Sequence, residues 1–91
     1  ARDPGVARSH MQTAARAGVV AAQHQLAIML AKGEGGKADP EAALMWFHIA
    51  ASLGDERARK NRDRYAKTLP QDIQTRAATR ARQFRPASSL Q

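Results

Sequence analysis

The sequence contains no cysteine, very few aromatic residues and no long hydrophobic run. Without cysteine, the chain can form neither disulfide bonds nor thiolate metal sites. No apolar run reaches the roughly 18 residues that a membrane-spanning helix needs, and no signal peptide is apparent. The aromatic side chains are Trp46, Phe47, Tyr65 and Phe84, so a core has to be built mainly from small residues. These absences exclude a disulfide scaffold and a bilayer-spanning helix within the 91 residues.

Alanine is the commonest residue, and β-branched residues are few. This composition favours closely packed helices over sheets, and the length fits one domain. The formal charge of +7 is unevenly distributed. Residues 1–54 carry five basic and four acidic side chains, whereas residues 55–91 carry ten and four. The sequence thus predicts an all-α protein whose basic character belongs to its last third.

The chain repeats itself with a period of 36 residues. The segment AARAGVVAA (14–22) aligns with AASLGDERA (50–58), which places Gly18 opposite Gly54. A period of roughly 20–50 residues indicates a solenoid of stacked repeats. Each of these glycines follows an Ala-Ala pair and suits the left-handed residue that ends a helix.

Proline and glycine mark the other helix ends. Asp39 and Pro40 suit a helix start, Leu69–Pro70 interrupts the chain, and the Gly-rich segment 32–40 reads as a connector. We expect a helical domain over residues 6–84, preceded by a disordered segment or cloning remnant (1–5) and followed by a flexible tail (85–91). The expected helices are antiparallel neighbours near residues 7–17, 20–32, 40–53, 55–68 and 71–84.

Residues 21–55 resemble one Sel-1-like repeat, a short relative of the tetratricopeptide repeat. The resemblance rests on a G-x-G connector, an acidic N-cap and a second helix with the pattern A-x-x-W…A-A-x-x-G. The matching residues are Ala22, Leu26, Gly33, Gly35, Asp39, Ala43, Trp46, Ala50, Ala51 and Gly54, with Gly18 ending the preceding repeat. Residues 55–84 resemble a degenerate capping repeat only in outline. Gly36 replaces a usual valine and is expected to loosen the connector.

The resemblance implies a short right-handed α-solenoid of antiparallel helix pairs. It also implies a non-catalytic scaffold, adaptor, accessory subunit or regulator that holds another protein or further repeats of the same chain. Self-association is a further alternative. No cofactor is implied. A bacterial periplasmic or envelope location is favoured by the resemblance alone.

Two surfaces are candidates for partner binding. The first is the groove between the helices near 20–32 and 55–68, with His24, Lys60 and Arg64 as contacts. The second is an apolar stripe on the helix near 40–53, formed by Met45, Ile49 and Leu53 at i, i+4 and i+8. The repeat pattern does not require this stripe. It either packs under another part of the chain or docks a partner or a second copy.

Other functions have weaker sequence support. The Arg/Lys-rich stretch 57–85 could bind nucleic acid or an anionic membrane, but only Tyr65 offers an aromatic ring within its densest run. Its basic residues suit solvated helix faces equally well. The three histidines lack metal-binding spacing, and no nucleophile stands beside a predicted base. We therefore predict neither a metal site nor an enzyme.

Overall fold

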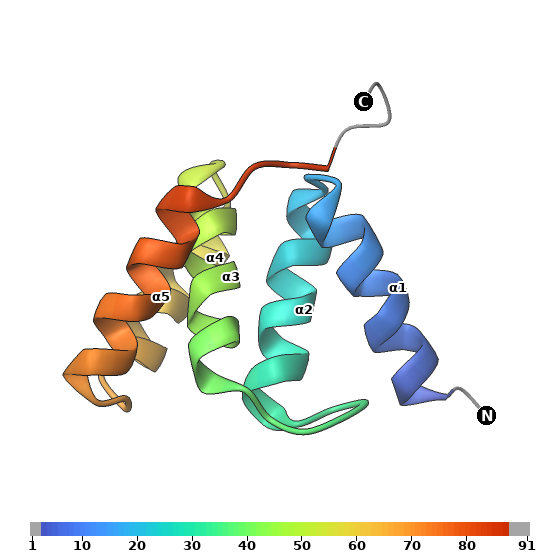
Figure 1. The fold of residues 1–91 in the computed structure, drawn as a ribbon, viewed down its shortest axis with the longest axis horizontal. Coiled ribbons are helices and arrows are strands. Elements are labelled where there is room, and N and C mark those ends of the chain that lie inside the picture. The colour runs from blue at the N-terminus through green and yellow to red at the C-terminus, as the bar shows by residue number, and fades with distance from the viewer. Residues whose placement is uncertain (1–2, 88–91) are drawn as a thin grey trace.

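The computed structural model describes residues 3–87, which form five α-helices and no strand. The helices are α1 (Pro4–Arg16), α2 (Val20–Lys32), α3 (Pro40–Ser52), α4 (Glu56–Ala66) and α5 (Gln71–Gln83), as Figure 1 shows. The predicted all-α repeat fold is confirmed. The bounds of α2 are those expected, and the ends of α3, α4 and α5 lie within about two residues of the expected positions, which is the usual uncertainty of helix ends.

Helix α1 begins three residues earlier than the sequence interpretation placed it. The carboxylate of Asp3 accepts a hydrogen bond from the Gly5 amide at 2.8 Å, and Pro4 occupies the first helical turn. Asp3 therefore caps the helix and residues 4–5 belong to it, which corrects the assignment of residues 3–5 to a segment outside the fold. The signal was present in the sequence, because an acidic N-cap followed by proline recurs 36 residues later at Asp39–Pro40.

The 36-residue repeat is visible in the backbone. Gly18 follows α1 with φ = 98°, and Gly54 follows α3 with φ = 100°. Both angles are positive, a region that side-chain-bearing residues avoid. Helix α1 is therefore the structural counterpart of α3, and each is followed by the same tight reversal into the next helix.

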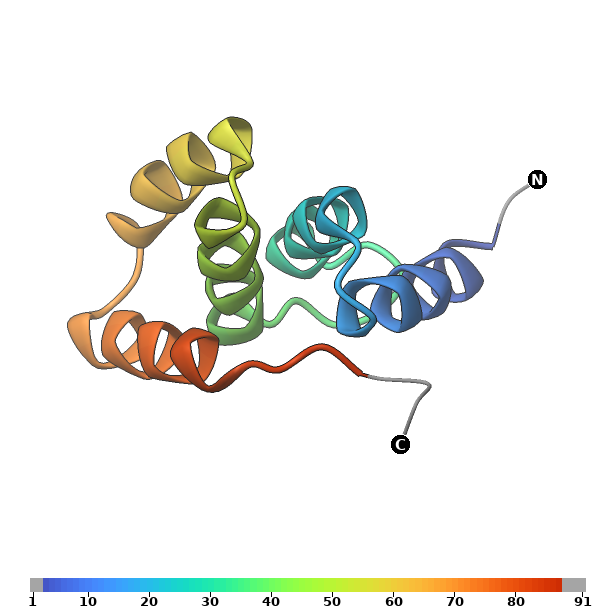
Figure 2. The same ribbon diagram turned by 90° about the horizontal axis from the view of Figure 1, so that it is seen from above.

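Helix α3 is the centre of the packing. It lies against α2, α4 and α5, while α1 packs on α2. Figure 2 shows α4 and α5 diverging on either side of α3, so that these two helices pack on α3 rather than on each other. Leu44 is completely buried and Phe47 is 3% exposed. The apolar circumference of α3 is thus covered from several directions, as expected of a helix that is hydrophobic all round.

The C-terminal segment after α5 returns across the molecule to α1 (Figure 1). Phe84 packs edge-to-face on Trp46, with 5.4 Å between ring centroids. The Ala87 amide then donates a 2.7 Å hydrogen bond to the Arg16 carbonyl, which lies in the last turn of α1. Residues 85–87 of the expected flexible tail are therefore held in place, and residues 88–91 lie outside the described part of the chain.

Arg8 of α1 holds the connector between α2 and α3. Its guanidinium donates hydrogen bonds to the carbonyls of Glu34 (2.8 Å), Lys37 (2.9 Å) and Met29 (3.2 Å). A Cβ atom at Gly36 would lie 2.9 Å from the Arg8 Nη1 atom. Glycine therefore makes room for the guanidinium. The expectation that Gly36 loosens the connector was wrong, because the arginine occupies the space that a side chain would fill.

We expect Arg8→Gln to lower the free energy of unfolding by about 1–3 kcal/mol, because charge-assisted hydrogen bonds to the connector are lost. Urea unfolding followed by circular dichroism measures the change. Arg57→Gln removes the same charge from an exposed arginine for which the described residues provide no hydrogen bond. Equal stability of the two variants would show that the hydrogen bonds from Arg8 to the connector do not stabilise the fold.

Candidate functional site

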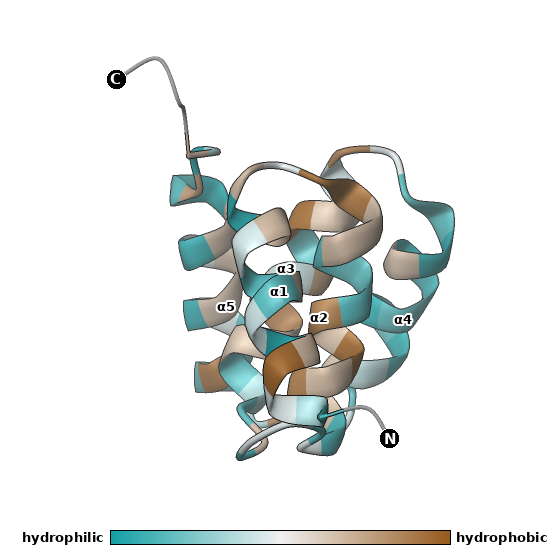
Figure 3. Ribbon diagram, turned by 90° about the vertical axis from the view of Figure 1, so that its right-hand side faces the viewer, coloured by the Kyte–Doolittle hydropathy of each residue, from teal (hydrophilic) through white to brown (hydrophobic). Residues whose placement is uncertain are grey.

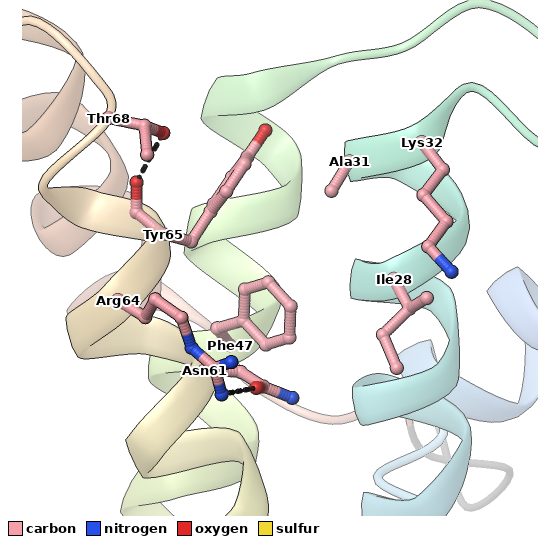
Figure 4. Close-up of a pocket in the computed structure, with 8 residues that line it drawn as sticks. All are labelled: Ile28, Ala31, Lys32, Phe47, Asn61, Arg64, Tyr65 and Thr68. Atoms are coloured by element: carbon pink, nitrogen blue, oxygen red, sulfur yellow. Dashed lines mark hydrogen bonds between the residues drawn. The ribbon is translucent and has the colours of Figure 1, made fainter.

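A groove runs between α2 and α4, with the side chain of Phe47 from α3 at its floor (Figure 4). Its volume is about 440 Å³, within the roughly 300–1,000 Å³ usual for ligand sites. The groove exists because α2 and α4 both pack chiefly on α3 and touch each other only locally, where Asn61 meets His24. The residues that line it are Ile28, Ala31, Lys32, Phe47, Asn61, Arg64, Tyr65 and Thr68.

The floor of the groove is aromatic. The rings of Phe47 and Tyr65 meet edge-to-face with centroids 5.8 Å apart, and Phe47 also lies 6.0 Å from the His24 ring. Figure 4 shows the Tyr65 hydroxyl pointing away from Phe47 toward the open end of the groove. Burial is the larger cause that raises the pKa of Tyr65, and the charge of Asp39 is the smaller one. The hydroxyl therefore remains a donor at neutral pH.

A chain of polar contacts fixes one wall. The Nδ2 atom of Asn61 lies 2.9 Å from Nε2 of His24, and its Oδ1 atom accepts a 3.0 Å hydrogen bond from Arg64. With the asparagine amide as donor, His24 accepts through Nε2. His24 is only 6% exposed. It therefore orients Asn61, which in turn orients the guanidinium of Arg64 at the groove surface.

The three groove residues expected from the sequence have different positions. Arg64 lines the groove, as expected. His24 lies behind the wall in the core, so its expected role as a surface contact is corrected to that of a positioning residue. Lys60 is exposed on α4 but does not line the groove.

Sequence reasoning missed seven of the eight groove residues, namely Ile28, Ala31, Lys32, Phe47, Asn61, Tyr65 and Thr68. A signal for α4 was available, because residues 61, 64, 65 and 68 follow the i, i+3, i+4, i+7 spacing of one helix face. On α2, Ile28, Ala31 and Lys32 share the same kind of spacing. The groove between these two helices was expected, but the sequence did not indicate which face of each helix borders it.

The apolar stripe of α3 is mostly core. Met45 is 9% exposed and Ile49 is 2% exposed, whereas Leu53 is 52% exposed. Ile49 borders a hollow formed with α5 and the C-terminal segment, including Ala81 and Phe84. Met45 and Ile49 are therefore corrected from partner-binding candidates to residues covered by this chain. Of the stripe, only Leu53 is accessible.

The basic residues between 57 and 85 are spread over two helices, and among the described residues only Arg62 of α4 and Arg82 of α5 border a common hollow beside His48. They are divided between α4 and α5, which flank α3 on different sides, and both helices are largely hydrophilic in Figure 3. Several are also neutralised by carboxylates. The ion pairs join Arg59 to Glu56, Arg62 to Asp63, Arg76 to Glu41 and Asp72, and Arg80 to Glu41. The structure therefore gives the nucleic-acid or membrane alternative no support.

Glu41 ties α5 to α3. Its carboxylate accepts from Arg76 at 2.7 Å and from Arg80 at 3.0 Å. These hydrogen bonds, that of Arg76 first, lower the pKa of Glu41. The arginines of α5 that face α3 thus stabilise the fold of this chain.

Comparisons with known proteins agree with the repeat. A family model described as the Sel1 repeat matches residues 1–19, which include α1, and residues 20–55, which include α2 and α3. A search of curated proteins finds no match. Within residues 3–87, no helix is both long and apolar enough to span a bilayer, and no cluster of three potential metal ligands is present.

Ile49→Asp is expected to unfold the protein, because it places a carboxylate at a buried apolar position. Leu53→Asp makes the same change one helical turn later at an exposed position and is expected to retain helicity. Far-ultraviolet circular dichroism measures both. A folded Ile49→Asp variant would show that this part of α3 is not core.

His48 gives the stability a pH dependence. Burial is the main cause that lowers the pKa of His48 from its ordinary value of 6.5, with the positive charge of Arg62 adding to it. Below about pH 6.5 the unfolded chain takes up a proton that the folded chain resists, so stability present above that pH is lost on acidification. Between pH 7.5 and pH 5.5, the melting temperature of the parent chain is expected to fall more than that of the His48→Gln variant. Equal decreases in melting temperature for the two proteins would show that His48 does not cause the pH dependence.

Proposed function

The chain belongs to the Sel1 repeat family, and we propose that it is a non-catalytic module that binds a partner protein in the groove between α2 and α4. Sel1 repeats mediate protein–protein interactions, which is the general function the family supports. That the partner binds in the α2–α4 groove is our proposal for this chain and does not follow from the family. The partner is another protein, and the module serves as a scaffold, adaptor, accessory subunit or regulator.

The observation that carries the proposal is an apolar groove that the chain does not fill itself. Ile28 and Tyr65 are only partly buried although both pack on the hydrophobic core, so their remaining apolar surface faces the groove. A second hollow, between α3, α5 and the C-terminal segment, is bordered by Ile49, Leu53 and Phe84, but its apolar residue Ile49 is only 2% exposed. Apolar surface bordered by polar groups is typical of interaction sites.

The test uses a display library of random peptides selected against the folded protein. We expect enriched peptides whose binding is lost in Ile28→Asn, because this variant places a polar amide against the groove floor. Leu53→Asn is the matched control, since Leu53 is exposed and lies outside the groove. Circular dichroism establishes that both variants are folded. Peptides that depend on Leu53 but not on Ile28, or a library without any groove-dependent binder, would refute the proposed function.

A further inference from the structure

We propose that the α2–α4 groove binds a peptide segment in which an apolar side chain is flanked by carboxylates. This inference rests on the proposed function and adds the chemistry of the partner. It depends on three features of the groove: an apolar floor, two cations on opposite walls, and a hydroxyl donor at the open end.

The floor provides the site for the apolar side chain. Ile28 and Ala31 come from α2, while Phe47 and Tyr65 come from α3 and α4. Burying apolar surface contributes about 25 cal/mol per Å², so one large side chain placed here is a sufficient anchor for a short peptide. The volume of about 440 Å³ accommodates one or two such side chains.

The two walls present positive charge. Lys32 extends from α2 and Arg64 from α4, on opposite sides of the floor (Figure 4). Within residues 3–87 neither forms an ion pair, although four other arginines of α4 and α5 do. No acidic residue lines the groove. The two cations are thus available for carboxylates placed on either side of an apolar anchor.

Arg64 is already oriented for such a contact. Its hydrogen bond to Asn61, which itself contacts the buried His24, restricts the guanidinium before any partner arrives. An ordered arginine loses less conformational entropy on binding than a free one. Hydrogen bonds between guanidinium and carboxylate are among the strongest that side chains form. The wall is therefore better prepared for an anion than an isolated surface arginine would be.

Tyr65 adds a neutral donor. Its hydroxyl has no hydrogen-bond partner among the described residues and points to the open end of the groove. Asp39 is the acidic residue that acts on it electrostatically, but the Asp39 carboxylate is engaged at 3.1 Å with the Ala42 amide as the N-cap of α3. The hydroxyl can therefore donate to a carboxylate or to a backbone carbonyl of the peptide.

The same features disfavour nucleic acid as the occupant. Single-stranded nucleic acid binds through aromatic rings that bases can stack on, together with cations that follow the phosphates. Phe47 is 3% exposed and its ring already meets Tyr65, so its face is closed to a base. An apolar side chain fits the floor, whereas a nucleic-acid strand would place its phosphates near Lys32 and Arg64 without an exposed aromatic face for its bases.

The experiment continues from the peptides that the display library enriches. Fluorescein-labelled copies of one enriched peptide are prepared with its Asp and Glu residues retained and with all of them changed to Asn and Gln. Fluorescence anisotropy is expected to show at least tenfold tighter binding of the acidic copy in low salt, with the advantage decreasing at 0.5 M NaCl as charges are screened.

Variants identify the side chains responsible. Lys32→Gln and Arg64→Gln are each expected to weaken the acidic copy three- to tenfold and to leave the neutral copy unchanged. Arg82→Gln removes the same charge from α5, outside the groove, and is expected to have no such effect. Binding that depends on Ile28 but is equal for acidic and neutral copies would overturn this inference and leave the proposed function intact. A labelled oligothymidylate that binds more tightly than the acidic peptide through Lys32 and Arg64 would also overturn it.

Discussion

Helix α3 carries apolar side chains around almost its whole circumference, and the chain has to remove all of them from water. No single neighbour can do this, because one helix covers only one stripe of another. Helices α2, α4 and α5 therefore each take a different side of α3, and Phe84 covers Trp46 where these helices do not. The positions of the other elements follow from this requirement.

The open groove is a consequence of the same requirement. Since α4 packs mainly on α3, it meets α2 only where Asn61 contacts His24, and the rest of the space between the two helices is lined by residues of both. The divergence of α4 from α5 has the same origin. In a uniform repeat α4 and α5 would pack on each other as α2 and α3 do. Here each of them packs mainly on α3. The groove and the divided arginines are thus two results of one packing demand.

The sequence predicts the helices and turns well because their signals are local. Proline and aspartate start α3, and Gly18 and Gly54 adopt the positive φ that their positions suggested. The contacts between distant residues were not accessible in this way. Nothing near Arg8 indicates that it binds a connector some 26 residues away, and His24 gives no sign that its partner is Asn61. The site was predicted to the level of two helices and Arg64, and its other residues depend on how those helices approach each other.

The hydrogen bond between Ala87 and Arg16 joins the last described turn of the chain to its first helix. In an open array of repeats each unit contacts only its neighbours, so the ends can unfold while the middle remains folded. Here the segment after α5 contacts the C-terminal end of α1, so α1 has a partner besides α2. Fraying of residues 85–87 therefore also removes a contact of α1, which links the last described part of the chain to its first helix. Because this contact joins residues far apart in sequence, it carries a larger loop-closure entropy than the contacts between neighbouring helices.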